Sequence, residues 1–98
     1  MPWELWTKDA YSFYFQEQYL NGVDRNRWHK FKETLRNTDN PRDFAITSCP
    51  NHKSKIILEI PDTEYFLAVY LHDKENPHPE NGECIILVKI AKLKDFTI

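Results

Sequence analysis

Three apolar runs succeed one another in the C-terminal half of the chain: Lys55-Ile-Ile-Leu-Glu-Ile60, Tyr65-Phe-Leu-Ala-Val-Tyr-Leu71 and Cys84-Ile-Ile-Leu-Val-Lys-Ile-Ala91. They are rich in β-branched and aromatic residues, and polar segments separate them, as is typical of β-strands. The last run is apolar on both faces apart from Lys89, which predicts a strand in the interior of a sheet. We therefore expect an antiparallel three-stranded meander in this half.

The N-terminal half predicts one short strand followed by helices. The strand is the aromatic segment Trp3–Thr7, which is β-prone. The first helix is expected to start at an N-cap, Thr7 or Asp9, and to stop at Gly22 in a left-handed conformation. One stripe of this helix is aromatic at helical spacing, and we expect it to pack in the core or between the helices. Its members are Tyr11, Tyr14, Phe15 and Tyr19.

A second helix is expected from an N-cap at Asp24 to the segment before Asn40-Pro41, because the residue preceding a proline avoids the α region. Its narrow apolar face is formed by Trp28, Phe31 and Leu35. The opposite face is basic, and Glu33 is the acidic residue among its cations. Its five cations are Arg25, Arg27, Lys30, Lys32 and Arg36.

The element order β-α-α-β-β-β predicts an α+β fold, with a helical hairpin packed on one face of an antiparallel sheet. Residues 1–98 suit a single domain. Residues 42–54 are expected to be mostly loop, with Phe44 and Ile46 in the core, and residues 73–82 to be an exposed, mobile loop.

Compartment and cofactors follow from what the sequence lacks. No run of about 18 apolar residues is present, so we expect no contact with a membrane. The N-terminus does not resemble a signal peptide, which favours a cytoplasmic protein. Cys49 and Cys84 are expected to be reduced thiols, with Cys84 buried in a strand. The four histidines lack ligand spacing, so we expect no metal and no cofactor.

Five short segments carry a resemblance to a known family: Arg27-Trp-His-Lys-Phe-Lys-Glu-Thr-Leu35, Asn40-Pro41, Lys55-Ile-Ile-Leu58, Leu67-Ala-Val-Tyr70, and Ile85-Ile-Leu-Val-Lys-Ile90 with Lys92. In order and composition they resemble the RelE/ParE toxins of bacterial toxin–antitoxin pairs, over nearly the whole chain. The resemblance implies an RNA endonuclease that acts at the ribosome, or a degenerate relative. It also implies an antitoxin protein as partner, together with RNA or the ribosome.

The chain departs from that family at the positions that cleave RNA. Family members place Arg on the middle strands and Arg with Tyr or His near the C-terminus, whereas this chain has Glu59, Leu93 and Phe96 there. Cleavage without a metal needs a base, an acid and cations around one phosphate. The remaining catalytic candidates are Lys92 and Lys94, which can hold phosphate, and His72, which precedes an aspartate.

Two further interpretations remain open. The five cations of the second helix form either a solvated outer face or a surface for a phosphate backbone. Lys89 either extends its amine to solvent or lines a concave site that binds nucleic acid. Because the cleaving positions are largely unmatched, the alternatives to a toxin are a non-enzymatic protein-interaction module of the same fold and an unrelated small α+β protein.

Overall fold

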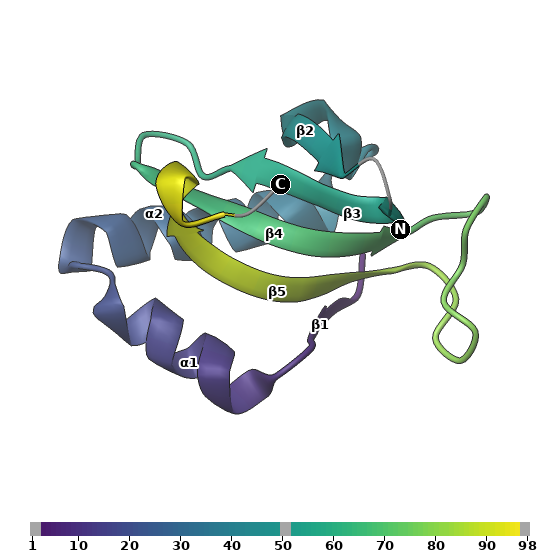
Figure 1. The fold of residues 1–98 in the computed structure, drawn as a ribbon, viewed down its shortest axis with the longest axis horizontal. Helices are drawn as coiled ribbons and strands as arrows, with labels where there is room; N and C mark the ends of the chain where they lie inside the picture. Colours follow the sequence, from purple (N-terminus) through teal and green to yellow (C-terminus); the bar gives the residue numbers. More distant parts are fainter. Residues whose placement is uncertain (1–2, 50–51, 97–98) are drawn as a thin grey trace.

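The computed structural model describes residues 3–49 and 52–96, and these residues contain two helices and a five-stranded mixed sheet (Figure 1). The α+β class is thereby confirmed. The helices are α1 (Ala10–Tyr19) and α2 (Gly22–Asn37). The strands are β1 (Leu5–Thr7), β2 (Ala45–Cys49), β3 (His52–Glu59), β4 (Tyr65–His72) and β5 (Cys84–Lys92). Two short 3-10 helices, η1 (Pro41–Phe44) and η2 (Leu93–Asp95), precede β2 and follow β5.

The strand order is β1-β5-β4-β3-β2. The antiparallel meander of β3, β4 and β5 is confirmed, and β5 lies inside the sheet as expected. The expectation of a wholly antiparallel sheet is wrong, because β1 pairs in parallel with β5. Parallel neighbours need a long connection, and the two helices and three strands between β1 and β5 provide it.

Residues 42–54 are not mostly loop. They contain part of η1, the strand β2 and the first residues of β3. Ile46 and Thr47 are β-branched and favour an extended chain, and pairing with β3 stabilises β2 at the edge of the sheet. Phe44 is half-buried and packs edge-on against Phe31 of α2, with ring centroids 5.4 Å apart. Ile46 remains 43% exposed, so its expected place in the core is wrong.

The two helices meet at a junction that differs from the expected one. Asp9 caps α1, accepting from the Ser12 amide at 3.1 Å. Asn21, rather than Asp24, caps α2, and its side-chain oxygen accepts from the Asp24 amide at 2.8 Å. Gly22 is therefore the first residue of α2 and not a left-handed stop after α1. The cap satisfies an amide that helix geometry leaves unpaired, so the chain passes almost directly from one helix to the next.

The core lies between the helices and one face of the sheet, with α2 behind the strands and α1 alongside β5 (Figure 1). Trp28, Phe31 and Leu35 of α2 are fully buried or nearly so, as their spacing predicted. The sheet contributes the side chains of one alternating face of each inner strand. These buried residues are Ile56, Leu58, Leu67, Val69, Leu71, Ile85, Leu87 and Ile90, with Ile60 directly after β3. A register shift between β4 and β5 interrupts the alternation between Leu87 and Ile90.

Cys84 is buried in β5, as predicted, opposite His72 of β4. Burial raises the pKa of the Cys84 thiol, and the nearby Glu4 carboxylate raises this pKa further. The folded chain therefore disfavours the thiolate, whereas the unfolded chain ionises freely above about pH 8.5. Below that pH Cys84 is protonated in both the folded and the unfolded chain, so it does not change the free energy of unfolding. Above that pH the unfolded chain loses the thiol proton first, so the free energy of unfolding falls as the pH rises.

In a Cys49→Ser background, we expect Cys84 to resist alkylation by iodoacetamide at pH 8.5 and to react fully once urea unfolds the chain. Mass spectrometry of the labelled peptide measures the reaction. Alkylation of the folded chain at the rate of the unfolded one would contradict this burial.

Candidate functional site

The helix α1 exposes an aromatic face to solvent. Tyr11 is 75% exposed, Tyr14 58%, Phe15 48% and Tyr19 86%. We call these four residues the α1 aromatic face. Their expected place in the core or between the helices is wrong, because Phe13 is the buried residue of this helix and the stripe points away from the sheet.

The opposite face of α1 packs inward, although it carries two polar residues. The Gln16 side-chain oxygen accepts from the backbone amide of Ile90 at 2.7 Å. Glu17 accepts from the Trp28 indole at 2.6 Å and pairs with Lys32 at 3.3 Å. The sequence of α1 contains two faces with apolar residues. Gln16 and Glu17 lie on the face that is buried with Phe13, so in the sequence this face resembles a solvent-exposed one. The signal that marks the other stripe is its tyrosines, whose hydroxyls favour a partly wet surface.

The α1 aromatic face is ordered by contacts within itself. The Tyr11 and Phe15 rings meet edge-on with centroids 4.9 Å apart, and Tyr14 lies 6.3 Å from Phe15. At roughly 200 Å² per aromatic side chain, the exposed fractions amount to about 500 Å² of surface. The largest apolar patch on a monomeric protein is commonly about 300–600 Å² and often functional, so this face is a candidate for interaction.

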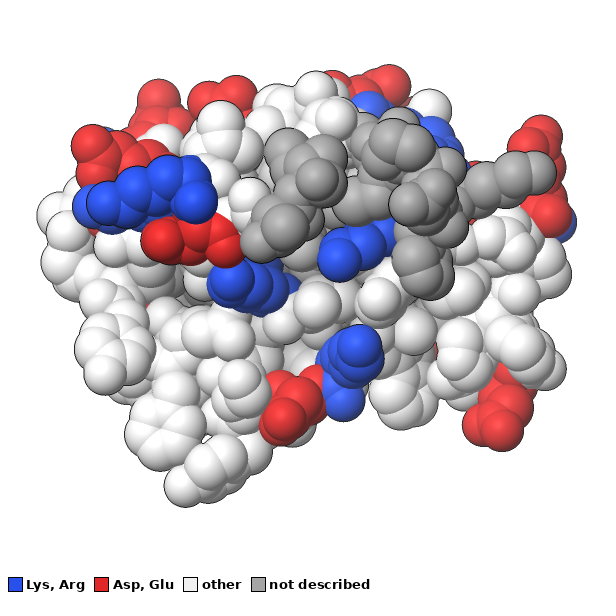
Figure 2. All heavy atoms as spheres, in the orientation of Figure 1, with Lys and Arg blue, Asp and Glu red and all other residues white. Residues whose placement is uncertain are grey.

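The surface over α1 lacks charge. Figure 2 shows it, at the lower left, as a white area without Lys, Arg, Asp or Glu. The helix contains one charged residue, Glu17, which is held on the inner side by Trp28 and Lys32. A surface of aromatic rings without charges fits a protein better than a nucleic acid, whose binding depends mainly on cations.

The catalytic candidates are not brought together. Lys92 ends β5 opposite Tyr65, whereas His72 ends β4 opposite Cys84. These positions are at opposite ends of β4, about 23 Å apart at roughly 3.3 Å per residue. His72 therefore cannot act on a phosphate that Lys92 and Lys94 hold.

Lys92 and Lys94 lie together at the other end of the sheet. Lys92 pairs with the exposed Glu64 at 3.4 Å. Both lysines line an open groove of about 460 Å³ that also includes Gln16, Tyr19, Tyr65 and Asp95. Two acids thus stand beside the two lysines, which weakens any attraction for phosphate. The groove continues from the C-terminal end of the α1 aromatic face through Tyr19.

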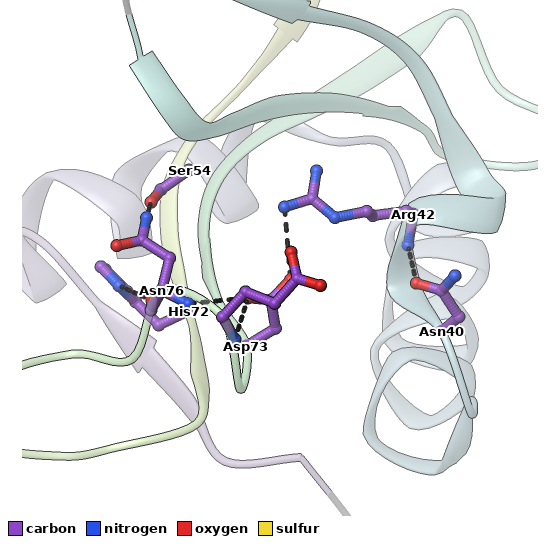
Figure 3. A network of polar contacts seen from close by, with 7 residues as sticks. Asn40, Arg42, Ser54, His72, Asp73 and Asn76 are labelled. Carbon is purple, nitrogen blue, oxygen red and sulfur yellow. Dashed lines mark hydrogen bonds and ion pairs between the residues drawn. The ribbon is translucent and has the colours of Figure 1, made fainter.

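His72 belongs to a structural network around the start of the β4–β5 loop (Figure 3). Its Nδ1 donates to the Asn76 carbonyl at 3.1 Å, and the Asn76 side chain donates to Ser54 on β3. The Asp73 carboxylate accepts from the Asn76 amide and pairs with Arg42 of η1 at 3.4 Å. These contacts fasten the loop to β3 and η1, so the adjacent histidine and aspartate serve structure here.

The basic residues of α2 are largely used within the fold. Arg25 donates to the Gln18 and Leu20 carbonyls at the end of α1, and Arg27 donates to the Asp62 carbonyl. Lys32 and Arg36 pair with acids, Glu17 and Glu33 respectively. Lys30 is exposed on the same helix. These contacts join α2 to α1 and to the β3–β4 turn, which leaves less of the helix available for a phosphate backbone.

Lys89 lies away from the cations of α2. It pairs across the ladder with Ala68, on the sheet face opposite the core. Its amine donates to the Asp95 carbonyl at 2.9 Å and lies over the Phe96 ring at 5.3 Å. Lys89 therefore fastens η2 to β5 and does not extend the basic surface of α2.

Within residues 3–49 and 52–96, no three His, Cys, Asp or Glu side chains gather where they could hold a metal ion. No helix in the same residues is long and apolar enough to cross a membrane. No protein-family model matches the chain, and no curated protein matches it either. The geometry of the described residues is thus the basis for a functional assignment.

Proposed function

We propose that this protein is a non-enzymatic protein-interaction module and that the α1 aromatic face is its binding surface. The observation that carries the proposal is the exposure of four aromatic side chains on one face of a ten-residue helix. Tyrosine and phenylalanine are enriched at protein interfaces, since they supply large contact areas and lose little conformational entropy on binding.

The arrangement of the polar residues supports a binding function over RNA cleavage. Cleavage requires an acid, a base and cations within reach of one phosphate, whereas His72 and the Lys92–Lys94 pair lie at opposite ends of β4. A relation to the RelE/ParE toxins remains part of the proposal, as a degenerate member that has the fold without the cleaving residues. The two helices that follow the first strand and the three-stranded meander support that relation, whereas the edge strand β2 between α2 and the meander is an addition to the expected element order.

Site-specific photocrosslinking in the native host tests the proposed surface. With benzoylphenylalanine at Tyr14, we expect covalent adducts to protein that disappear when Tyr11→Ser and Tyr19→Ser are added. Glu59, which is exposed on β3, is the control position and should give no such adducts. The absence of adducts at Tyr14, or the same adducts at both positions, would contradict the proposal.

A growth assay tests separately the proposal that the protein is not an enzyme. If expression in a bacterial host arrested growth and produced cut transcripts, and Lys92→Ala abolished both effects, the protein would be an RNA-cleaving toxin and not a binding module.

A further inference from the structure

We infer that the α1 aromatic face binds a second copy of this chain, with the two α1 helices packed antiparallel about a two-fold axis beside Phe15. This inference rests on the proposed function, because it names the partner of the same surface. Two features of the face support a second copy, the spacing of its rings and the position of its charges, and its area limits the strength of the pair.

The spacing of the rings is self-complementary. Tyr11 and Tyr19 lie four residues before and four residues after Phe15, so the three side chains form one ridge along the helix. A two-fold axis at Phe15 places the two Phe15 rings against each other and Tyr11 of each copy against Tyr19 of the other. A two-fold interface requires such a pattern, since the same patch serves both subunits.

The charges near the face also suit an antiparallel pair. The face itself contains no charged residue that would repel its copy or select an acidic or basic partner. Each end of the face carries one cation and one acid: Lys8 and Asp9 are exposed at the N-terminal end of α1, and Lys94 and Asp95 lie with Tyr19 at the C-terminal end. Antiparallel packing allows Asp9 of one copy to face Lys94 of the other and Lys8 to face Asp95. It also places opposite ends of the helix dipoles side by side.

The area of the face limits the pair to a weak, reversible dimer. Complete burial of all four aromatic side chains would supply about 500 Å² per copy, whereas stable interfaces of standard size bury about 800 Å² per partner. Exposed Ser12 and Gln18 on the same helix add to the contact. The interface is at the small end of the range, so we expect a dimer that dissociates on dilution.

Sedimentation of the purified full chain over a range of concentrations tests the inference. We expect the mass to rise from that of a monomer to that of a dimer, without larger species. Phe15→Glu should give a monomer at every concentration, because it places two like charges against each other at the axis. Ile46→Glu is the matched control, since Ile46 is exposed to a similar extent on β2, and it should leave the dimer intact. Circular dichroism verifies that both variants fold.

Disulfide trapping tests the antiparallel geometry in a Cys49→Ser background. A cysteine at position 15 should crosslink efficiently to its own copy under mild oxidation. The Tyr11→Cys and Tyr19→Cys variants should each crosslink poorly alone and efficiently when mixed. Equal crosslinking at all three positions, alone or mixed, would overturn the two-fold arrangement.

A wild-type chain that remains monomeric at all concentrations would overturn the inference, and so would a dimer that Phe15→Glu and Ile46→Glu disrupt equally. The test of the dimer and the test of the proposed function can fail independently. If the chain is monomeric and position 14 still crosslinks to a different protein, the proposed function stands and the second copy is wrong. If neither assay detects a partner, both are wrong.

Discussion

Replacing Trp28 with alanine is expected to lower the free energy of unfolding by about 3–5 kcal/mol. The Trp28 side chain is fully buried in α2 and contacts Phe13 and Phe31, with ring centroids 5.9 and 6.5 Å away. Its indole donates the 2.6 Å hydrogen bond to Glu17. The alanine variant therefore leaves a cavity between the helices and removes a partner from a half-buried carboxylate.

Urea unfolding followed by circular dichroism measures this loss. Trp28→Phe retains a ring in the core but loses the donor to Glu17, so it should fall between the wild type and the alanine variant. Trp6→Ala is the matched control, because Trp6 is about half exposed on β1 and its removal creates no cavity. If Trp28→Ala and Trp6→Ala cost the same, α1 and α2 do not share the core described above.

Replacing Gln16 with alanine is expected to cost about 1–3 kcal/mol, since it leaves a buried backbone donor unpaired. The short strand β1 pairs with β5 only from Ile85 to Leu87. Beyond that point no strand lies on the β1 side of β5, although β4 still pairs with Ile90 on the other side. On the β1 side the Gln16 side chain provides the acceptor for the Ile90 amide, at 2.7 Å. Gln16 thus provides a hydrogen-bond acceptor to β5 on the edge where β1 pairs, beyond the end of β1, and this bond fastens α1 to the sheet.

Two measurements check the role of Gln16. Urea unfolding gives the cost, and hydrogen exchange should show faster exchange at the Ile90 amide in Gln16→Ala than in the wild type. Gln18→Ala is the matched control, because Gln18 is exposed on the other side of the helix. Unchanged protection of the Ile90 amide in Gln16→Ala would show that this hydrogen bond does not form in solution.

Variants on the two faces of α1 should affect folding stability and the proposed dimer differently. Gln16→Ala acts on the inner face and should weaken both folding and dimer formation, because the aromatic face is presented only while α1 stays against β5. Phe15→Glu acts on the outer face, where the side chain is about half exposed, and should abolish the proposed dimer at little cost in stability.

The sequence predicted the parts of the fold that depend on local periodicity. The runs that became β3, β4 and β5 alternate or are continuously apolar, and their order along the chain allows a meander with short connections. Trp28, Phe31 and Leu35 fall on one face of a helix wherever that helix lies. Such patterns are properties of neighbouring residues, so they are visible before the chain folds.

The candidate site was not predictable in the same way. Periodicity shows which side chains of α1 share a face, but it does not show which face meets the sheet. The sequence therefore favoured the aromatic stripe for the core. The structure places Phe13 there, because Gln16 and Glu17 find partners on β5 and α2 and can be buried beside it.

The sequence by itself determined the α+β class, the meander and the buried face of α2, since each follows from local side-chain patterns. Only the tertiary structure decided that β1 runs parallel to β5, that β2 forms an edge, and that His72 lies far from Lys92. It also decided that the tyrosines of α1 face outward. These features depend on strand register and on polar contacts between residues distant in the chain, which no local pattern records.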